Sequence, residues 1–391
     1  MDHVLRCHDL VKSDLVRGGD CVVFDREGKA YVDFEAGIWC AGLGHGHPRI
    51  TEVIRRQSET LMHTGFKFTT QLAEDAAVAV LSALRWDNGR CVFLSSGSEA
   101  VEFGVTIARR LTDRTRLLTL AGAYLSALGS AGSQSPETWH HLELDACLSC
   151  PEGETCHADC EVLSAVPFSK LAGFVFDGGN LHGTARFPPY GLIRRISDRV
   201  QDEGGLLIAN EVTAGMGRTG RWFGFEHYGI RPDVVILGKG LGNGYPVSAV
   251  VVCPEVAKPL EQSGFVYAQS HQSDPLACAV AREVIAVMRE ERLAERSHEV
   301  GERFLALLQE LAHRTNAIAE VRGRGLMIVV DLKREHASAA SAFSELLERG
   351  FIVGASDALN HLRFYPPLTI AIDQIESLMA ALTEILEAST S

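Results

Sequence analysis

Apolar residues between positions 90 and 253 occur in short continuous runs separated by longer amphipathic stretches. Strands with one face in water alternate apolar and polar residues, whereas continuous runs are typical of parallel strands covered by helices on both faces. The predicted strands are 91–94, 173–176, 206–212, 233–237 and 248–253. The pattern predicts a large α/β domain, in which ligands bind at the carboxyl ends of the strands.

The pattern changes after residue 273 to long amphipathic helices with few strands. Helices are predicted at 274–292, 297–312, 341–348 and 373–386, and a strand at 326–332. We expect residues 46–293 to form the large domain and residues 294–391 to form a smaller α+β domain. Residues 1–45, with a hairpin around residues 25–29, are expected to contribute to the small domain. The length suits two domains, because single cores rarely grow beyond roughly 300 residues.

Composition narrows the possible functions. The chain has 37 basic and 50 acidic residues and a net charge of −13 at pH 7, so it lacks the basic surface with which nucleic-acid-binding proteins neutralise phosphates. No apolar run reaches the roughly 20 residues of a membrane-spanning helix, and the N-terminus lacks the pattern of a signal peptide. We expect a cytoplasmic protein that binds neither nucleic acid nor membrane.

Lys239 directly follows a predicted buried strand and lies between Gly238 and Gly240. A lysine is normally a solvated surface group. Here the flanking glycines let a ligand approach the backbone, and burial would lower the pKa of the amine. A lysine that forms a Schiff base requires such a lowered pKa.

The residues before Lys239 carry a family resemblance. Glu211 and Val212 lead into a Gly-Met-Gly-Arg-Thr-Gly turn at 215–220, and Lys239 follows the next strand. The chain resembles the class III, ornithine/ω-amino-acid type aminotransferases along nearly its whole length. The resemblance implies the fold type I of pyridoxal-phosphate-dependent transferases, with a mostly parallel central sheet in the large domain and a smaller α+β domain. It also implies that Lys239 binds pyridoxal phosphate as a Schiff base.

The turn at 215–220 also fits the dinucleotide-binding pattern G-x-G-x-x-G. That pattern requires an amphipathic helix directly after it. The residues that follow, 221–229, are aromatic and broken by glycine. The sequence therefore argues against a nicotinamide-binding site.

A predicted strand ends in a Ser/Gly turn at 95–98, which opens a predicted helix at 99–110. Free backbone N–H groups and the positive end of the helix dipole form a suitable phosphate site, although an ordinary helix cap has the same sequence. Beside Lys239, the turn resembles the family's phosphate loop. The resemblance implies that Gly97 and Ser98 bind the cofactor phosphate.

Two further cofactor contacts are implied by the resemblance. Tyr124 stands where the family has an aromatic residue stacked on the pyridine ring, although a tyrosine after a strand is more often simple packing. Ser270 stands where the family has a threonine that reaches the phosphate across a dimer interface. We therefore expect a homodimer with the active site at the interface.

The resemblance also indicates how a small-molecule amino substrate is bound. Arg363, in the segment 361–368, matches the family arginine that binds the substrate carboxylate, a role that suits the planar, bidentate guanidinium. A surface arginine is the alternative. Trp39 precedes a segment that resembles one near the family's substrate entrance, and we expect it to line that entrance.

Four cysteines form a cluster, namely Cys147, Cys150, Cys156 and Cys160, with His157 among them. Four thiols and an imidazole at this spacing could form a tetrahedral zinc site. Reduced or disulfide-paired thiols in a loop are the alternative. The sequence leaves both open.

Three positions depart from the family. Asn210 stands where the family has an aspartate that keeps the pyridine nitrogen protonated, Asp177 stands where it usually has a glutamate, and Leu125 stands where it has a histidine. A neutral amide cannot supply an ion pair to the pyridine nitrogen, so the cofactor should be a weaker electron sink. The departures suggest an altered reaction or substrate.

The predicted activity is amino transfer from an amino acid or amine to a 2-oxo acid, with Lys239 as the general base. A weakened electron sink also suits a lyase that eliminates a group from the β-carbon and releases ammonia. A racemase, a decarboxylase and a cofactor-binding protein without efficient catalysis are further alternatives.

Overall fold

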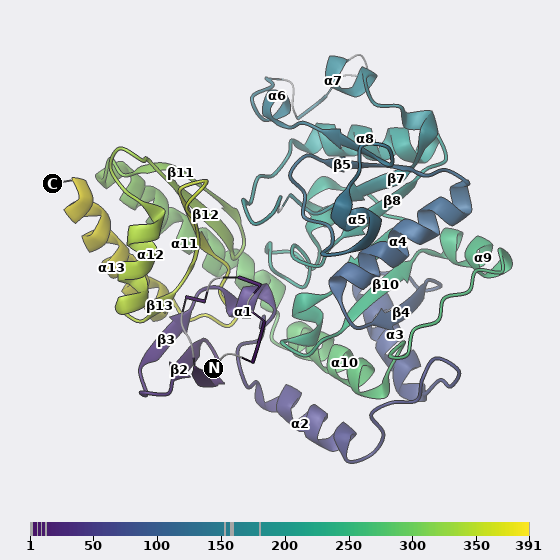
Figure 1. Ribbon diagram of the computed structural model, residues 1–391, viewed down its shortest axis with the longest axis horizontal. Helices are drawn as coiled ribbons and strands as arrows, with labels where there is room; N and C mark the ends of the chain where they lie inside the picture. The colour runs from purple at the N-terminus through teal and green to yellow at the C-terminus, as the bar shows by residue number, and fades with distance from the viewer. Residues whose placement is uncertain are drawn as a thin grey trace.

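The computed structural model has two lobes, one built on a seven-stranded sheet and the other on a four-stranded antiparallel sheet (Figure 1). The structure describes residues 3–5, 7–8, 10–11, 14–151, 154–156, 160–179 and 181–390. Within these residues, no helix combines the length and the apolar character needed to cross a lipid bilayer.

The large sheet has the strand order β4-β10-β9-β8-β7-β5-β6. Its strands are β4 (Arg90–Leu94), β5 (Arg116–Leu120), β6 (Trp139–Leu142), β7 (Leu171–Phe176), β8 (Leu206–Asn210), β9 (Val234–Leu237) and β10 (Ser248–Val252). All run parallel except β10, which is antiparallel to β4 and β9. Every residue of β7, β9 and β10 is buried, as continuous apolar runs require.

The predicted sheet is therefore present, with three differences. The run at 248–253 was expected to be parallel and is antiparallel, because a continuous apolar run does not encode strand direction. The strand expected at 206–212 ends at Asn210. The strands β5 and β6 were not among the predicted ones, and in β6 the polar residues His140 and His141 interrupt the apolar run.

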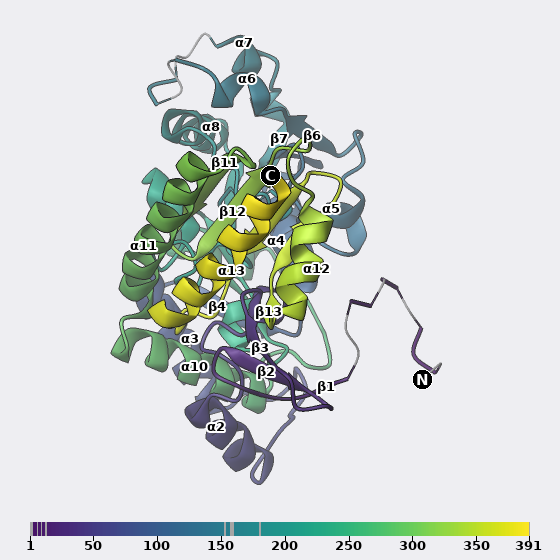
Figure 2. The same ribbon diagram turned by 90° about the vertical axis from the view of Figure 1, so that its left-hand side faces the viewer.

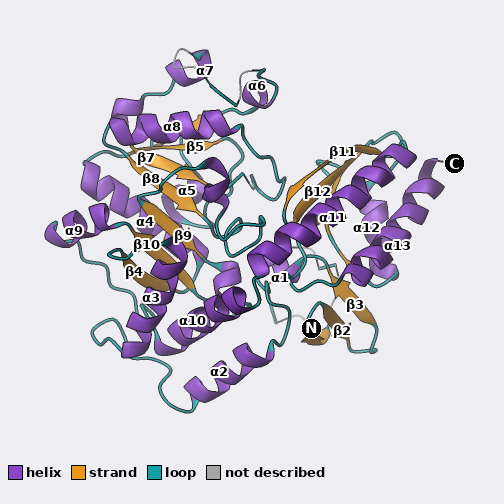
Figure 3. Cartoon of the chain, turned by 180° about the vertical axis from the view of Figure 1, so that it is seen from behind, coloured by secondary structure: helices purple, strands orange, loops and turns teal. Residues whose placement is uncertain are grey.

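The large lobe contains many helices, several of which cover its sheet (Figure 3). They are α2 (Pro48–Ser58), α3 (Gln71–Leu84), α4 (Gly97–Thr112), α5 (Gly129–Ser133), α6 (Asp145–Leu148), α7 (Glu161–Ser164), α8 (Tyr190–Asp202), α9 (Pro254–Gln262) and α10 (Pro275–Glu290), with the 3-10 helices η1 (Phe168–Lys170), η2 (Gly224–Tyr228) and η3 (Lys239–Gly242). The helix α4 packs on β7 to β10. It starts at the carboxyl end of β4, where Ser96 Oγ accepts a hydrogen bond of 3.2 Å from the Glu99 N–H.

The second lobe has the strand order β11-β12-β15-β14. Its elements are β11 (Ile318–Arg324), β12 (Met327–Leu332), β14 (Gly354–Ser356) and β15 (His361–Phe364), with α11 (Leu293–Arg314), α12 (Ala339–Glu348) and α13 (Ile372–Thr390). The helices α11 and α12 contact this sheet, and α13 packs on both of them. Apolar side chains of β12 and β15 that face the helices form the core of the lobe.

The N-terminal strands join the second lobe (Figure 2). The strands β1 (Leu15–Gly19), β2 (Val22–Asp25) and β3 (Ala30–Asp33) form a sheet with β13 (Phe351–Ile352), and the short turn α1 (Ala36–Trp39) follows. The pair β2–β3 is the predicted hairpin, and β3 lies parallel to β13. The domain boundaries at residues 45 and 293 stay a prediction.

Candidate active site between the two domains

Loops from three strand ends meet around Val212, which follows β8. At the start of α4, a Cβ atom on Gly97 would lie 2.8 Å from Val212 Cγ1. At the end of β9, a Cβ atom on Gly238 would lie 3.3 Å from Val212 Cγ1 and 3.5 Å from Gly97 Cα. Side chains at these glycines would fill the space between the loops. The close approach brings the predicted phosphate loop beside Lys239.

Lys239 begins η3 directly after β9, with a left-handed φ of 41° that is unfavourable for a residue with a side chain. Its Nζ donates a 2.8 Å hydrogen bond to Thr213 Oγ1 and lies 4.1 Å from the centre of the Trp39 ring. Burial lowers the pKa of the amine to about 8. A much larger fraction of this amine is neutral near pH 7 than of an ordinary lysine, as a nucleophile and general base requires.

Asn210 ends β8, two residues before Val212, and is only 5% exposed. Its Oδ1 accepts a 3.3 Å hydrogen bond from the Val212 N–H. The side chain is therefore held at the carboxyl end of the sheet, beside the loops that meet at Val212.

Two buried carboxyl groups lie in neighbouring loops. Asp177 accepts hydrogen bonds from the N–H groups of Gly179 and Leu181 at 3.2 and 2.9 Å. Glu211 accepts hydrogen bonds from two N–H groups of η2, at 2.7 and 2.8 Å. Burial raises the pKa of Asp177 to about 6 and that of Glu211 to about 7. Both groups are structural anchors whose oxygens are engaged by the backbone.

The first turn of α4 offers free donors. Within the described residues, the backbone N–H groups of Gly97 and Ser98 make no hydrogen bond. The Ser98 hydroxyl accepts a 2.9 Å hydrogen bond from the Ala127 N–H, which leaves its own proton for a ligand. Free N–H groups at the positive end of a 16-residue helix suit a phosphate.

Trp39 contacts both Lys239 and Arg363. The guanidinium carbon of Arg363 is 4.8 Å from the centre of a Trp39 ring. Its Nε and Nη2 donate hydrogen bonds of 3.0 and 2.8 Å to the two carboxylate oxygens of Glu35. Burial raises the pKa of Glu35, and Arg363 opposes this effect. The predicted carboxylate-binding arginine therefore holds a carboxylate of its own chain.

A left-handed turn positions Glu35 and Trp39. The φ angles of Ala36, Ile38 and Trp39 are 46°, 57° and 68°. Left-handed helical backbone costs roughly 1–2 kcal/mol per residue with a side chain. The Asp33 carboxylate supports the turn, because it accepts hydrogen bonds from the backbone N–H groups at 35 and 37. Strain of this kind concentrates at functional sites.

The other two predicted cofactor contacts lie on the surface of this chain. Tyr124 follows β5, is 48% exposed and packs edge-on against His182 with 5.4 Å between ring centres. Ser270 is exposed in the loop before α10. Tyr267 in the same loop donates a 2.9 Å hydrogen bond to Glu99 of α4. The loop of Ser270 is thus attached to the phosphate loop of its own chain.

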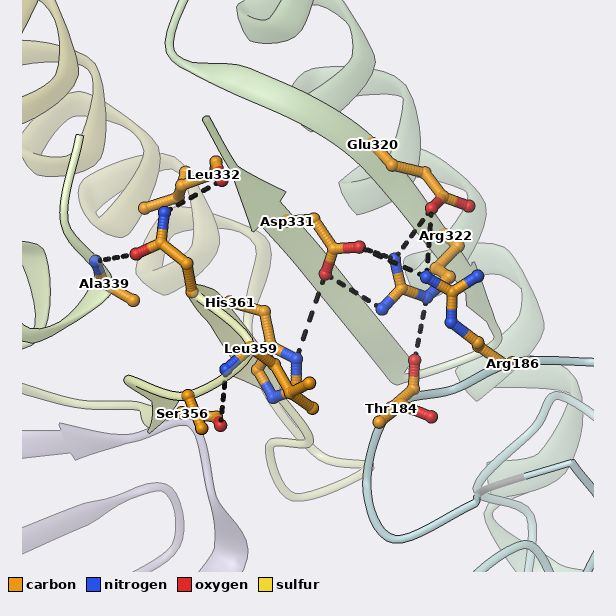
Figure 4. Close-up of polar contacts among 12 residues, drawn as sticks. Thr184, Arg186, Glu320, Arg322, Asp331, Leu332, Ala339, Ser356, Leu359 and His361 are labelled. Carbon is orange, nitrogen blue, oxygen red and sulfur yellow. Dashed lines mark hydrogen bonds and ion pairs between the residues drawn. The ribbon is translucent and has the colours of Figure 1, made fainter. Parts of the chain in front are cut away.

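A polar network joins the second lobe to the large domain (Figure 4). Asp331 of β12 accepts hydrogen bonds of 2.6 and 2.9 Å from Arg322 of β11, and it lies opposite His361 of β15. Arg322 also donates a 2.8 Å hydrogen bond to the carbonyl of Thr184, in the loop after Asp177. A cleft of about 450 Å³ between the lobes is lined by Thr184, Arg322, Asp331 and His361. The network holds the loop after β7 against the small-domain sheet.

The cysteine cluster stays a prediction as a metal site. All ten cysteines are free thiols. In the described part of the chain, no three of the sulfur atoms of Cys147, Cys150, Cys156 and Cys160 lie within 4.8 Å of one another. His157 lies outside the described residues.

Another polar cluster was not predicted. His63 and His271 each form a 2.6 Å hydrogen bond with Asp274, the residue before α10. Their ligand atoms are close enough for one metal ion. The two hydrogen bonds already account for the cluster.

The sequence also did not reveal Glu35, which contacts Arg363, or Thr213, which contacts Lys239. Glu35 is 328 residues from Arg363 in the chain, and no local pattern marks the pair. Thr213 could have been found, because it closely follows a strand whose carboxyl end was expected to carry the site.

The comparisons with known proteins agree with this geometry. Residues 6–386 match the model of the family Aminotransferase class-III. The chain belongs to the class III aminotransferase family. The acetylornithine aminotransferase of Methanocaldococcus jannaschii is 33% identical over 382 residues, which cover 95% of this chain and 92% of that relative. This chain is therefore a pyridoxal-phosphate-dependent aminotransferase.

Solved structures of class III aminotransferases share the fold. An acetylornithine aminotransferase from Elizabethkingia anophelis has a TM-score of 0.84 at 26% identity, covering 99% of this chain and 96% of that one. An S-selective transaminase from Bacillus megaterium has a TM-score of 0.90 at 22% identity, covering 100% and 96%. The predicted family, fold type and aminotransferase function are confirmed.

The residues fit pyridoxal phosphate. The class III enzyme has a buried amine of lowered pKa, a helix start with free N–H groups, and two glycines that let the loops carrying these groups pack against Val212. An aldehyde matches the amine, a phosphate matches the helix start, and the close packing of the loops brings the two binding groups together.

Proposed function

We propose that Lys239 binds pyridoxal phosphate in this aminotransferase and that Gly97 and Ser98 bind its phosphate. Tyr124 and Asn210 would contact the ring, and Asp177 would hold the adjoining loop. The meeting of the phosphate loop and the lysine loop at Val212 supports this assignment. The bound cofactor supplies the electron sink that amino transfer requires.

The chain's own groups would move the proton. The Lys239 amine, with its pKa of about 8, takes a proton from the substrate carbon and returns it. Thr213 Oγ1 accepts a hydrogen bond from Nζ and thereby orients the amine. Trp39 covers the amine and excludes water from it.

The single observation that carries the substrate class is that Lys239 and Arg363 both lie over Trp39, so the amine and the guanidinium are close to each other. A substrate can place its reacting amine at Lys239 while its carboxylate replaces Glu35 on Arg363. The substrate would be an amino compound with a carboxylate away from the reacting amine, and the acceptor a 2-oxo acid. N-acetylornithine, the substrate implied by the names of the relatives, has this chemistry.

The assembly and the metal content belong to the same proposal. A homodimer would place Ser270 near the phosphate of the partner subunit, and the enzyme would work in the cytoplasm. Zinc at the cysteine cluster would stabilise the segment between α6 and α7. Sedimentation and metal analysis of the purified enzyme would test the dimer and the zinc.

The test is product analysis. The loaded enzyme is mixed with N-acetylornithine and 2-oxoglutarate, and glutamate and free ammonia are measured. Glutamate formed in equal amount to the substrate consumed is expected of the aminotransferase. Asn210 favours a lyase as the second candidate, and ammonia without glutamate would support that candidate instead. Neither product from this pair or from other amino donors would contradict both.

A further inference from the structure

The orientation of the Asn210 amide is decided by its neighbour. The Val212 N–H points at the amide from 3.3 Å. A backbone N–H can bond only to an acceptor, so the near atom must be the carbonyl oxygen and Nδ2 must point elsewhere. Among the residues that the structure describes, Nδ2 makes no hydrogen bond, yet it is not one of the atoms sealed from solvent. Asn210 therefore presents a free N–H donor.

The nearby acids cannot take over the role of a carboxylate at position 210. Both oxygens of Asp177 and both oxygens of Glu211 accept hydrogen bonds from backbone N–H groups. Neither acid bonds to Asn210. Their raised pKa values also mean that each carries a negative charge less readily than an ordinary carboxyl group.

We propose that Asn210 donates its Nδ2–H to the ring nitrogen of pyridoxal phosphate and so keeps that nitrogen unprotonated. The proposal rests on the proposed function, in which the cofactor lies between Lys239 and the phosphate loop. An unprotonated pyridine nitrogen is an acceptor and matches the free donor. A protonated nitrogen would face a donor with its own N–H, and a buried cation without a counter-charge is costly.

Residue 210 would then determine whether the pyridine ring of the cofactor carries a positive charge. With a neutral nitrogen the cofactor withdraws electrons less strongly, so proton transfer depends more on Lys239 and Thr213. Asn210→Asp would introduce a carboxylate at the same place and favour a protonated nitrogen. We expect the rate of the first half-reaction to rise about tenfold in this variant, which corresponds to about 1.4 kcal/mol.

The direct test is ¹⁵N nuclear magnetic resonance of the enzyme loaded with pyridoxal phosphate labelled at the ring nitrogen. Free cofactor measured at acid and alkaline pH gives the two reference positions. The wild-type enzyme should show the unprotonated position from pH 6 to 9, and Asn210→Asp should move the signal to the protonated one. A protonated position in the wild type would overturn the proposal.

Two controls keep the result interpretable. Glu211→Gln should leave the wild-type signal unchanged, and a shift in it would mean that Glu211 sets the charge. If Asn210→Asp fails to fold or to bind cofactor, the wild-type spectrum alone still decides between the two positions. A wild-type enzyme that binds no labelled cofactor, or whose Schiff-base absorbance persists after Lys239→Ala, would instead refute the proposed function.

Discussion

Buried and partly buried carboxylates are held differently in the two lobes. In the large domain, Asp177 and Glu211 accept hydrogen bonds from the backbone, and burial raises their pKa values to about 6 and about 7. On the opposite side, Glu35 and Asp331 each accept two hydrogen bonds from an arginine. The first pair has no ionic partner, and the second pair forms ion pairs.

The difference separates two tasks. Backbone-held acids fix loops, and their burial makes each of them ionise less readily than an ordinary carboxyl group. Ion pairs can exchange one carboxylate for another, and a substrate carboxylate can therefore replace Glu35. In the proposed function, the large domain would set the electronics of the cofactor and the small-domain side would recognise the substrate.

The largest effect should follow from removing Arg363, the arginine on which a substrate carboxylate can replace Glu35. Arg363→Ala is expected to lower kcat/KM for N-acetylornithine about a thousandfold, roughly 4 kcal/mol, because it removes the carboxylate partner and leaves Glu35 buried and unpaired. Steady-state kinetics measure this. Arg363→Lys is the matched control and should lose less, because it keeps the charge without the bidentate geometry. Unchanged kinetics in both variants would remove Arg363 from substrate binding.

Removing a backbone-held acid should mainly affect stability. Glu211→Ala is expected to lower the free energy of unfolding by about 2–4 kcal/mol, because two buried N–H groups of η2 lose their acceptor. Glu211→Gln keeps one acceptor oxygen and should cost less. Urea unfolding measures both. A loss below about 1 kcal/mol in the alanine variant would show that the carboxyl group is not an anchor.

The same acid predicts a pH dependence. Because the Glu211 pKa rises from 4.5 to about 7 on folding, the folded protein keeps this proton after the unfolded chain has lost it. The stability of the wild type relative to Glu211→Gln should therefore fall as pH rises from about 4.5 to about 7, and then level off. Urea unfolding at several pH values would show it, and a relative stability that rises over this range would contradict the raised pKa.

The smallest effect is expected at the ion pair of Arg322 and Asp331, whose arginine also bonds to the large domain. Arg322→Gln should cost about 1–2 kcal/mol, because Arg322 is largely buried and also bonds to Thr184. The exposed pair of Arg349 and Glu384 is the matched control, and Arg349→Gln should cost less than about 1 kcal/mol. If urea unfolding gave equal losses of unfolding free energy for the two variants, the network in Figure 4 would stabilise the protein no more than an exposed ion pair does.

The predictable part of the site was local in sequence. Lys239 and Gly97 could be predicted as site residues because each closely follows an apolar strand and stands in a recognisable motif. Arg363 was assigned through a motif, but its pairing with Glu35 could not be predicted, because it depends on how distant segments pack. Likewise, the apolar run of β10 predicted a buried strand but not its antiparallel direction.

The central claim is that Lys239 binds the cofactor. Reduction of the loaded enzyme with borohydride fixes the cofactor to its lysine, and peptide mass spectrometry then locates the label. The account predicts the label on the peptide that contains Lys239 and on no other. A label on another lysine such as Lys258, or no label after reduction, would contradict it.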